Sequence, residues 1–247
     1  MTEAVRLAKR LAEMLACSRR EAEQYITGGF VRVDGVVIEE PQHRVQAQKI
    51  EISPDATLLG VVPVTLLLHK PAGSEAGLGA TQGALRSADL LQPQSLWAED
   101  ISGLSPLKKH FAEQQLLTPL APRASGLVVF SQDWRIARKL TEDASVMEHE
   151  VLVEVSGEIK AGGLERLNRV DHGFTFNGMP LGAAKVSWQS EKRLRFALKG
   201  ERPGQIAYLC ECVGLQVEAM KRIRIGRVAM SSLPVGQWRY LLPHEKF

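Results

Sequence analysis

The periodicity of the apolar residues changes once along the chain, and this change limits which folds are possible. Residues 1–52 show helical spacing followed by one hairpin pattern, whereas residues 64–247 contain short apolar runs typical of β-strands. The segment between them, residues 53–63, contains two prolines and a glycine and keeps neither period. We therefore expect a small N-terminal domain over residues 1–52, a linker over residues 53–63 and a larger domain over residues 64–247.

The small domain is predicted to consist of two helices and a hairpin. An apolar stripe on the first helix, residues 6–16, is formed by Leu7, Leu11, Met14 and Leu15. Ser18 and Glu21 have the spacing of a capping box, in which each side chain satisfies a free backbone N–H at the start of a second helix. Asp34-Gly35 then predicts the tight turn of a hairpin, because both residues tolerate a positive φ.

The larger domain is predicted to combine strands and helices. Five apolar runs have the length and composition of strands: residues 65–70, 126–131, 149–155, 193–199 and 216–225. Asp133 can cap one helix, residues 205–214 form another, and Asn177-Gly178 marks a further hairpin. Since strands and helices do not alternate regularly, the pattern favours an α+β fold.

Composition excludes several classes of protein. Of the 247 residues, 45% are hydrophobic and 24% are charged, which are ordinary values for a globular chain. The longest apolar run, residues 58–68, is far shorter than the roughly 20 residues of a membrane-spanning helix. Residues 1–25 lack the pattern of a secretory signal. We expect a soluble, cytoplasmic monomer without a membrane partner.

The cysteines and histidines do not have the spacing of metal ligands. The three cysteines contain no CxxC pair, and none of the six histidines lies three or four residues from another histidine or a cysteine. We expect reduced thiols and no metal site.

The first fifty residues resemble the S4 RNA-binding domain, through the segments RLAKRLAE and CSRREAEQYITGGFVRVDGVV. The resemblance implies phosphate contacts by Lys9, Arg19 and Arg20. Two arginines just after Ser18 disfavour an isolated helix, because its N-terminus is already positive, and they suit an anionic partner better. The alternative is that they are ordinary solvated side chains, since residues 1–45 contain seven basic and seven acidic residues.

Most of the remaining chain resembles the pseudouridine synthases that act on single uridines of ribosomal RNA and carry an S4 domain. The segments LLLHKPAG and SGLVVFSQD and the C-terminal stretch from GQIAYLCECVG to GQWRYL carry the resemblance, which is weakest over residues 74–117. It implies a mixed, mainly antiparallel sheet with flanking helices. It also implies an isomerisation that needs no metal and no organic cofactor, and structured RNA, most naturally ribosomal RNA, as the partner.

The residues that carry this chemistry in the family are absent. The resemblance places the essential aspartate of the family at Ala121 and a stacking tyrosine at Val151, and its basic pair at Ala207 and Tyr208. We therefore expect no catalytic residue and an RNA-binding protein that is catalytically inactive. The alternative is an active uridine isomerase that uses a non-standard acid; the nearest acids along the chain, Asp133 and Glu148, have no precedent in the family.

Basic residues accumulate near the C-terminus. Residues 192–239 contain ten basic and three acidic side chains, and in KRIRIGR the arginines Arg222 and Arg224 alternate with isoleucines. A strand would place both arginines on one face, expected to be exposed. The further RNA-binding candidates are Lys70, Gln205, Lys221, Arg222 and Arg224.

Residues 74–117 are predicted to be an insertion. The glycine-rich GLGATQG, residues 77–83, has the wrong spacing for a nucleotide-binding loop and predicts a flexible loop instead. A short helix is expected after Ser105. The insertion is either a tolerated surface segment or, as a weaker alternative for the whole protein, the basis of a protein-interaction scaffold.

Overall fold

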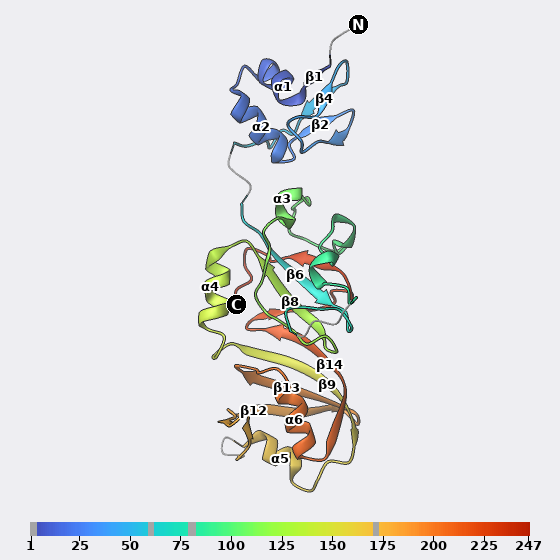
Figure 1. The fold of residues 1–247 in the computed structure, drawn as a ribbon, viewed down its shortest axis with the longest axis vertical. Coiled ribbons are helices and arrows are strands. Elements are labelled where there is room, and N and C mark those ends of the chain that lie inside the picture. The colour runs from blue at the N-terminus through green and yellow to red at the C-terminus, as the bar shows by residue number, and fades with distance from the viewer. Residues whose placement is uncertain (1–3, 59–61, 79–82, 170–172) are drawn as a thin grey trace. The chain divides into compact units, whose positions relative to one another are not determined.

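The computed structural model describes residues 4–58, 62–78, 83–169 and 173–247. The chain divides into two compact units: Met1–Pro63 with Ser105–Ala112, and Val64–Leu104 with Glu113–Phe247 (Figure 1). The segment Ser105–Ala112, which belongs to the predicted insertion, is therefore part of the first unit. It contains α3 (Lys108–Phe111), a single helical turn in the place of the short helix expected after Ser105.

The first unit consists of two helices and short strands. Its elements are α1 (Leu7–Leu15), α2 (Arg19–Thr27), a β1–β4 pair (Val5–Arg6 and Arg44–Val45) and a sheet of β3 (Val36–Val37), β2 (Val31–Val33) and β5 (Ile50–Ile52). The capping box is confirmed, because the Glu21 N–H donates to Ser18 Oγ at 3.2 Å and the Ser18 N–H donates to Glu21 Oε2 at 2.7 Å. Asp34 and Gly35 have positive φ values of 49° and 82°, as the hairpin turn requires.

The predicted apolar stripe of the first helix is only partly buried. Leu7 and Leu11 are fully buried, whereas Met14 and Leu15 are exposed. The helix ends at Leu15, because Ala16 adopts the left-handed conformation with a φ of 50°. Neither Met14 nor Leu15 belongs to the core of the unit.

The second unit is built on a nine-stranded mixed sheet. Its strands are β6 (Thr65–Lys70), β7 (Gln115–Leu116), β8 (Ser125–Ser131), β9 (Glu148–Gly157), β12 (Ala184–Ser190), β13 (Arg193–Lys199), β14 (Leu215–Ile225), β15 (Val228–Ala229) and β16 (Trp238–Tyr240). The order is β12-β13-β9-β14-β8-β6-β16, with β15 beside β14 and β7 beside β8. The pairing of β14 with β8 is parallel and the other pairings of these strands are antiparallel. The predicted α+β class with a mixed, mainly antiparallel sheet is confirmed.

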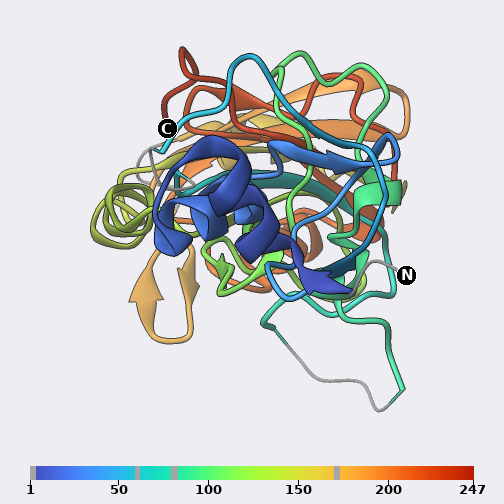
Figure 2. The same cartoon turned by 90° about the horizontal axis from the view of Figure 1, so that it is seen from above.

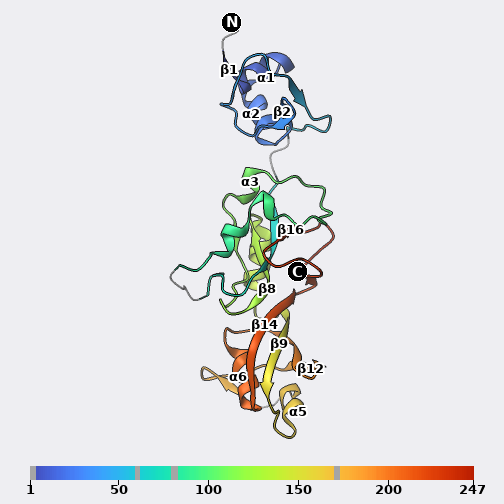
Figure 3. The ribbon, with the colours of Figure 1, turned by 90° about the vertical axis from the view of Figure 1, so that its right-hand side faces the viewer.

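Three helices pack against this sheet, and the core between helices and sheet consists of two hydrophobic clusters. The helices α5 (Gly163–Asn168) and α6 (Gln205–Cys212) lie with β9, β12, β13 and β14 around one hydrophobic cluster (Figure 1). The helix α4 (Trp134–Glu142) packs with β6 and β8 around a second cluster that includes Leu67, Leu127 and Leu140. The long strands β9 and β14 run side by side between the two clusters (Figure 3). Asp133 caps α4 as predicted, its carboxylate accepting the Arg135 N–H at 2.8 Å.

Two further segments complete this unit. A hairpin of β10 (Thr175–Phe176) and β11 (Met179–Pro180) turns at Asn177-Gly178, as predicted, and projects from the unit (Figure 2). Short 3-10 helices at Ser87–Leu90 and Pro93–Ser95 follow the predicted flexible loop at residues 77–83, which lies largely outside the described residues.

The second half of the insertion is tied to the edge strand β16. The Trp97 N–H donates to the Trp238 carbonyl at 2.8 Å, the Trp238 Nε1–H donates to the Gln92 carbonyl at 2.8 Å, and Asp100 accepts the Tyr240 N–H at 2.9 Å. These bonds satisfy backbone groups that a sheet edge otherwise leaves open.

None of the helices in the described part of the chain has the length and hydropathy of a membrane-spanning helix.

Candidate functional site

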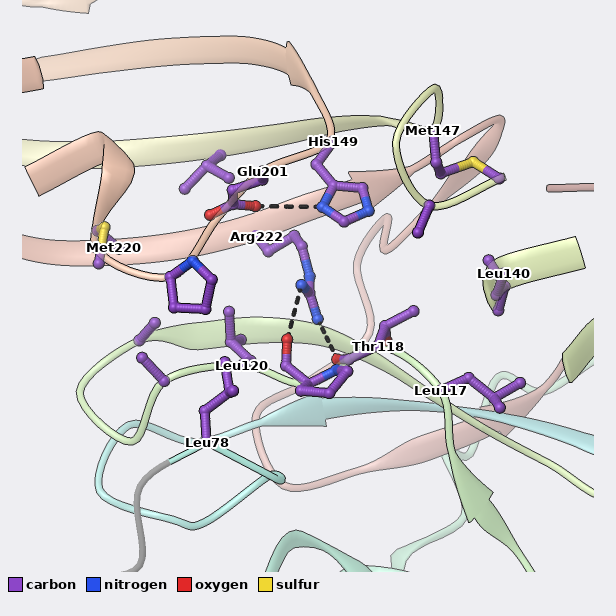
Figure 4. Close-up of a pocket in the computed structure, with 17 residues that line it drawn as sticks. Leu78, Leu117, Thr118, Leu120, Leu140, Met147, His149, Glu201, Met220 and Arg222 are labelled. Carbon is purple, nitrogen blue, oxygen red and sulfur yellow. Dashed lines mark hydrogen bonds and ion pairs between the residues drawn. The ribbon is translucent and has the colours of Figure 1, made fainter. Parts of the chain in front are cut away.

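A cavity of about 260 Å³ lies in the second unit, between the segment before β8, the start of β9 and the loop before α6 (Figure 4). Its walls are mainly apolar. They are formed by Leu78, Leu117, Thr118, Pro119, Leu120, Ala121, Ala124, Leu140, Ala144, Met147, His149, Val151, Glu201, Pro203, Gly204, Met220 and Arg222. An apolar hollow with a few polar side chains is the usual form of a small-molecule or substrate site.

Lys70 holds the wall between β7 and β8 in place. It is fully buried at the end of β6, and its ammonium donates to the carbonyl oxygens of Pro71 (3.0 Å), Pro122 (3.1 Å) and Ala124 (2.7 Å). Burial lowers the pKa of the ammonium to about 8. All three N–H groups are used by the backbone, so the predicted RNA contact by Lys70 is not favoured by its position.

Arg222 supplies a buried cation to the cavity. Its guanidinium, on β14, donates to the carbonyl oxygens of Thr118 (2.6 Å), Pro119 (3.2 Å) and Leu127 (2.9 Å) (Figure 4). Burial lowers its pKa to about 10, and the negative charge of Glu201 acts in the opposite direction. The expected exposed position of Arg222 is therefore wrong: the side chain is only 3% exposed, because the parallel β8–β14 pairing covers it.

Glu201 and His149 form a pair on the opposite wall. The His149 Nδ1 lies 3.2 Å from Glu201 Oε2, and the two side chains are 16% and 17% exposed. Figure 4 shows Arg222 between this pair and Thr118. Among the described residues that line the cavity, Glu201 is the only one with a carboxylate.

Sequence analysis did not identify Glu201 as a site residue. It lies 80 residues after Ala121 and 50 residues after Val151, so only the folded chain brings the three together. One signal was available: Glu201 stands four residues before Gln205, in the loop leading to a helix that the resemblance associates with the catalytic pocket.

Ala121 and Val151 do lie in one cavity wall. They are the positions that the resemblance assigns to the family aspartate and tyrosine, and here they present only a methyl and an isopropyl group. Neither acid considered as a replacement lines the cavity: Asp133 caps α4, and Glu148 pairs with Arg224. The carboxylate found in the cavity is a third one, Glu201.

Gln205 and Tyr208 lie beside the cavity without lining it. Gln205 is buried, and its Oε1 accepts the Arg202 N–H at 3.1 Å, which fixes the loop that carries Glu201. Tyr208 packs against Phe176, with ring centroids 5.4 Å apart, and edge-on against Phe174 at 6.5 Å. Position 208, basic in the family by resemblance, is thus part of an aromatic cluster.

The face of the sheet that carries Arg224 is not the basic surface that the sequence predicts. Arg224 bonds to both Glu148 and Glu150, and Arg195 bonds to Glu150 at 2.5 Å. Arg193 pairs with the glutamate opposite it on β9 at 2.5 Å. The glutamates of β9 lie between the arginines of β13 and β14 and compensate their charge, which a count along the C-terminal stretch cannot reveal.

Basic side chains gather instead on the first unit. A hollow of about 580 Å³ is lined by Ala4, Val5, Arg6, Lys9, Ala12, Glu13, Cys17, Arg19 and Arg44. Of the predicted contacts, Lys9 and Arg19 line it, whereas Arg20 is exposed outside it. Arg6 and Arg44 were not predicted; Arg44 comes to the hollow through the β1–β4 pairing. The hollow therefore has four cations and one acid around it.

The potential metal ligands of the described residues do not cluster. No group of three or more potential metal ligands occurs among the described residues.

Both parts of the chain are similar to known proteins. Residues 5–49 match the S4 domain family. An uncharacterized RNA pseudouridine synthase of Aquifex aeolicus is 27% identical over 245 residues, covering 98% of this chain and 94% of the relative. The ribosomal small subunit pseudouridine synthase A of Pseudomonas aeruginosa is 25% identical and covers 98% of both chains. The dual-specificity RNA pseudouridine synthase RluF of Escherichia coli is 26% identical, over 98% of this chain and 77% of the relative.

One solved structure supports the fold of the whole chain. A crystal structure of a pseudouridylate synthase matches with a TM-score of 0.57 at 17% identity, covering 96% of each chain. This match shows that the chain shares the fold of that structure, and the S4 match and the relatives show that the chain is similar to S4-domain-containing RNA pseudouridine synthases.

Proposed function

We propose that the protein binds structured RNA, with ribosomal RNA as the partner, and does not convert uridine to pseudouridine. The observation that carries the proposal is the composition of the cavity wall, where Ala121 and Val151 replace the family's carboxylate and aromatic ring. Removing a catalytic nucleophile typically lowers the rate of an enzyme by about 10⁴-fold or more.

RNA binding is supported by the hollow on the first unit. Arg6, Lys9, Arg19 and Arg44 surround one concave surface, an arrangement suited to RNA phosphates. The name of the Pseudomonas aeruginosa relative, a ribosomal small subunit pseudouridine synthase, supports ribosomal RNA. Lys9, Arg19, Arg20 and Lys221 remain candidate contacts, to which the hollow adds Arg6 and Arg44.

The cavity of the second unit gives this RNA binder a second contact. A nucleotide that leaves its stack costs a few kcal/mol, which a fitted pocket recovers through packing and hydrogen bonds. Without the family aspartate, the base in this cavity is held and released unchanged.

The test measures binding and isomerisation on the same samples. The full chain is titrated into transcripts of small- and large-subunit ribosomal RNA, retention on a filter reports binding, and the recovered RNA is digested and assayed for pseudouridine. We expect salt-dependent binding and no pseudouridine above the protein-free control. Pseudouridine formed at the rate of an active relative contradicts the proposal.

A second candidate function is supported by Glu201. A carboxylate in the cavity beside a buried arginine is the kind of group that could replace the missing aspartate, which favours an active isomerase with a relocated acid. The two functions differ in one result: an active isomerase loses its activity in Glu201→Gln and keeps it in Asp133→Ala and Glu148→Ala.

A further inference from the structure

Trp134, the first residue of α4, is the most exposed tryptophan of the chain. It is 64% exposed, whereas Trp238 is fully buried and Trp97 and Trp188 are partly buried. Tryptophan stabilises a fold mainly through the large apolar surface that it buries, and it is a weaker helix former than alanine or leucine. Neither packing nor helix formation therefore explains a tryptophan at this position.

Two arginines lie beside the Trp134 ring. The guanidinium carbon of Arg135 lies 5.7 Å from the ring centroid, and Arg138 follows Trp134 by four residues on the same face of the helix. In the described part of the chain, the Arg135 guanidinium makes no ion pair with a carboxylate. A cation in the first turn opposes the positive N-terminus of a helix, so Arg135 suits an anionic partner better than it suits α4.

The nearby acidic side chains leave these cations accessible. Asp133 is the N-cap of α4, and its carboxylate accepts the Arg135 backbone N–H at 2.8 Å. Glu142, at the other end of the helix, pairs with Arg138 at 2.9 Å, and both side chains of this pair are more than 60% exposed. Exposed ion pairs contribute little stability, so Arg138 can exchange Glu142 for a phosphate at small cost.

The same helix reaches the cavity of the second unit. Leu140 lines that cavity, and six residues separate it from Trp134, which corresponds to about 9 Å along a helix axis. Figure 1 shows α4 along the border of the second unit. RNA that places a nucleotide in the cavity therefore lies close to α4.

We propose that Trp134, Arg135 and Arg138 form a stacking platform for an unpaired RNA base: the base stacks on the indole ring, and a neighbouring phosphate accepts hydrogen bonds from the two arginines. The proposal rests on the proposed function and adds to it a site outside the cavity. Because every base has an aromatic face, the platform holds RNA without selecting its sequence.

The test follows the tryptophan fluorescence of the full chain during titration with hexaadenylate, a single-stranded RNA. We expect quenching, because the stacked base contacts the Trp134 ring. A hexamer of abasic ribose phosphates has the same backbone charge and no bases, and in competition with hexaadenylate it should bind at least tenfold more weakly. Equal binding of the two hexamers overturns the proposal. No quenching at about 1 mM hexaadenylate also overturns it and favours a protein contact for Trp134.

Variants assign the stacking to Trp134, with affinity measured by the fluorescence anisotropy of fluorescein-labelled hexaadenylate. We expect Trp134→Leu to bind about tenfold more weakly than the wild type, and Trp134→Phe, which keeps an aromatic face, to recover most of the affinity. The matched control is Ile101→Ala, which removes an exposed apolar side chain of the same unit outside α4. An unchanged affinity in Trp134→Leu, or an equal loss in the control, overturns the role of Trp134.

The phosphate contact is tested through its salt dependence. In the double variant Arg135→Gln with Arg138→Gln, the slope of log affinity for hexaadenylate against log salt should become less steep by about one. An unchanged slope overturns the contact with the arginines.

Retention of ribosomal RNA on a filter separates this proposal from the proposed function. Failure of the full chain to retain ribosomal RNA refutes the proposed function. Retention of ribosomal RNA by a chain whose affinity for hexaadenylate is the same in the wild type and in Trp134→Leu refutes only the platform.

Discussion

Gly126 lies directly opposite Arg222 in the parallel pairing of β8 with β14, and a Cβ atom at Gly126 would stand 2.2 Å from the Arg222 carbonyl oxygen. The φ of Gly126 is +117°, a conformation that other residues rarely adopt. This contact fixes the distance between two walls of the cavity, β14 and the Thr118–Ala124 segment. The segment leads directly into β8 and Gly126, and the guanidinium of Arg222 donates hydrogen bonds to the segment.

Replacing Gly126 by alanine should therefore destabilise the second unit strongly. We expect Gly126→Ala to lower the free energy of unfolding by more than about 3 kcal/mol, from strain and backbone collision together. Gly178→Ala is the control: its φ is also positive, at 73°, but nothing lies within 4 Å of the added carbon. Urea denaturation measures the free energy of unfolding of both variants. Equal losses of stability in the two would contradict the close approach of Gly126 to the backbone of Arg222.

Lys70 should contribute to stability in a pH-dependent way. Lys70→Met leaves three buried or partly buried carbonyl oxygens without their donor, which should lower the free energy of unfolding by about 3 kcal/mol at pH 7. In the wild type the pKa is about 8 when folded and near its ordinary 10.5 when unfolded, so the unfolded chain binds more protons between these values. The free energy of unfolding of the wild type should therefore rise by up to about 3 kcal/mol relative to that of Lys70→Met as the pH rises from 8 to 10.5. Urea denaturation at several pH values measures this change. A difference in the free energy of unfolding that stays constant from pH 8 to 10.5 would contradict the lowered pKa of the buried ammonium.

His69 should make the protein sensitive to mild acid. The ring is 1% exposed, its Nδ1 lies 2.7 Å from the Leu233 carbonyl oxygen, and burial lowers its pKa below 6.5. As the pH falls below 6.5, the unfolded chain takes up a proton that the folded chain does not, so stability is lost with falling pH. In His69→Asn, which keeps a donor for Leu233, the loss between pH 7 and pH 5 should be smaller. Identical acid sensitivity in chemical denaturation would exclude His69 as the cause.

The hollow on the first unit predicts how RNA affinity responds to mutation and salt. The double variant Lys9→Gln with Arg44→Gln should bind ribosomal RNA more weakly, and the slope of log affinity against log salt should become less steep by about one to two. Arg193→Gln, which removes an ion-paired arginine from the second unit, is the control and should leave both quantities unchanged. A larger loss of RNA affinity in Arg193→Gln than in the double variant would indicate that the RNA contacts the sheet of the second unit instead.

Local structure followed from the sequence wherever neighbouring residues decide it. The Ser18–Glu21 capping box and the Asp34-Gly35 turn depend on contacts within four residues, and Asp133 caps its helix through the same kind of bond. The fold class followed from the strand runs and from the resemblance of long segments.

The chemistry of the site was less predictable, because it depends on which strands become neighbours. Lys70 and Arg222 look like surface cations in sequence, yet backbone carbonyls from another segment surround both of them. Glu150 neutralises Arg195 and Arg224 only because β9 lies between β13 and β14. Glu201 enters the cavity from a loop distant in sequence from the other walls.

RNA binding without isomerase activity is distinguished from catalysis by single-turnover release of tritium from ribosomal RNA labelled at carbon five of uridine. Rejoining uracil to ribose through carbon five breaks the carbon–tritium bond, so each pseudouridine formed releases one label. With the protein in excess over RNA that it demonstrably binds, we predict no release above the protein-free background. Release at the rate of an active relative, lost in Glu201→Gln but kept in Glu154→Gln, a variant of the Arg193 partner outside the cavity, would instead establish an isomerase with a relocated carboxylate.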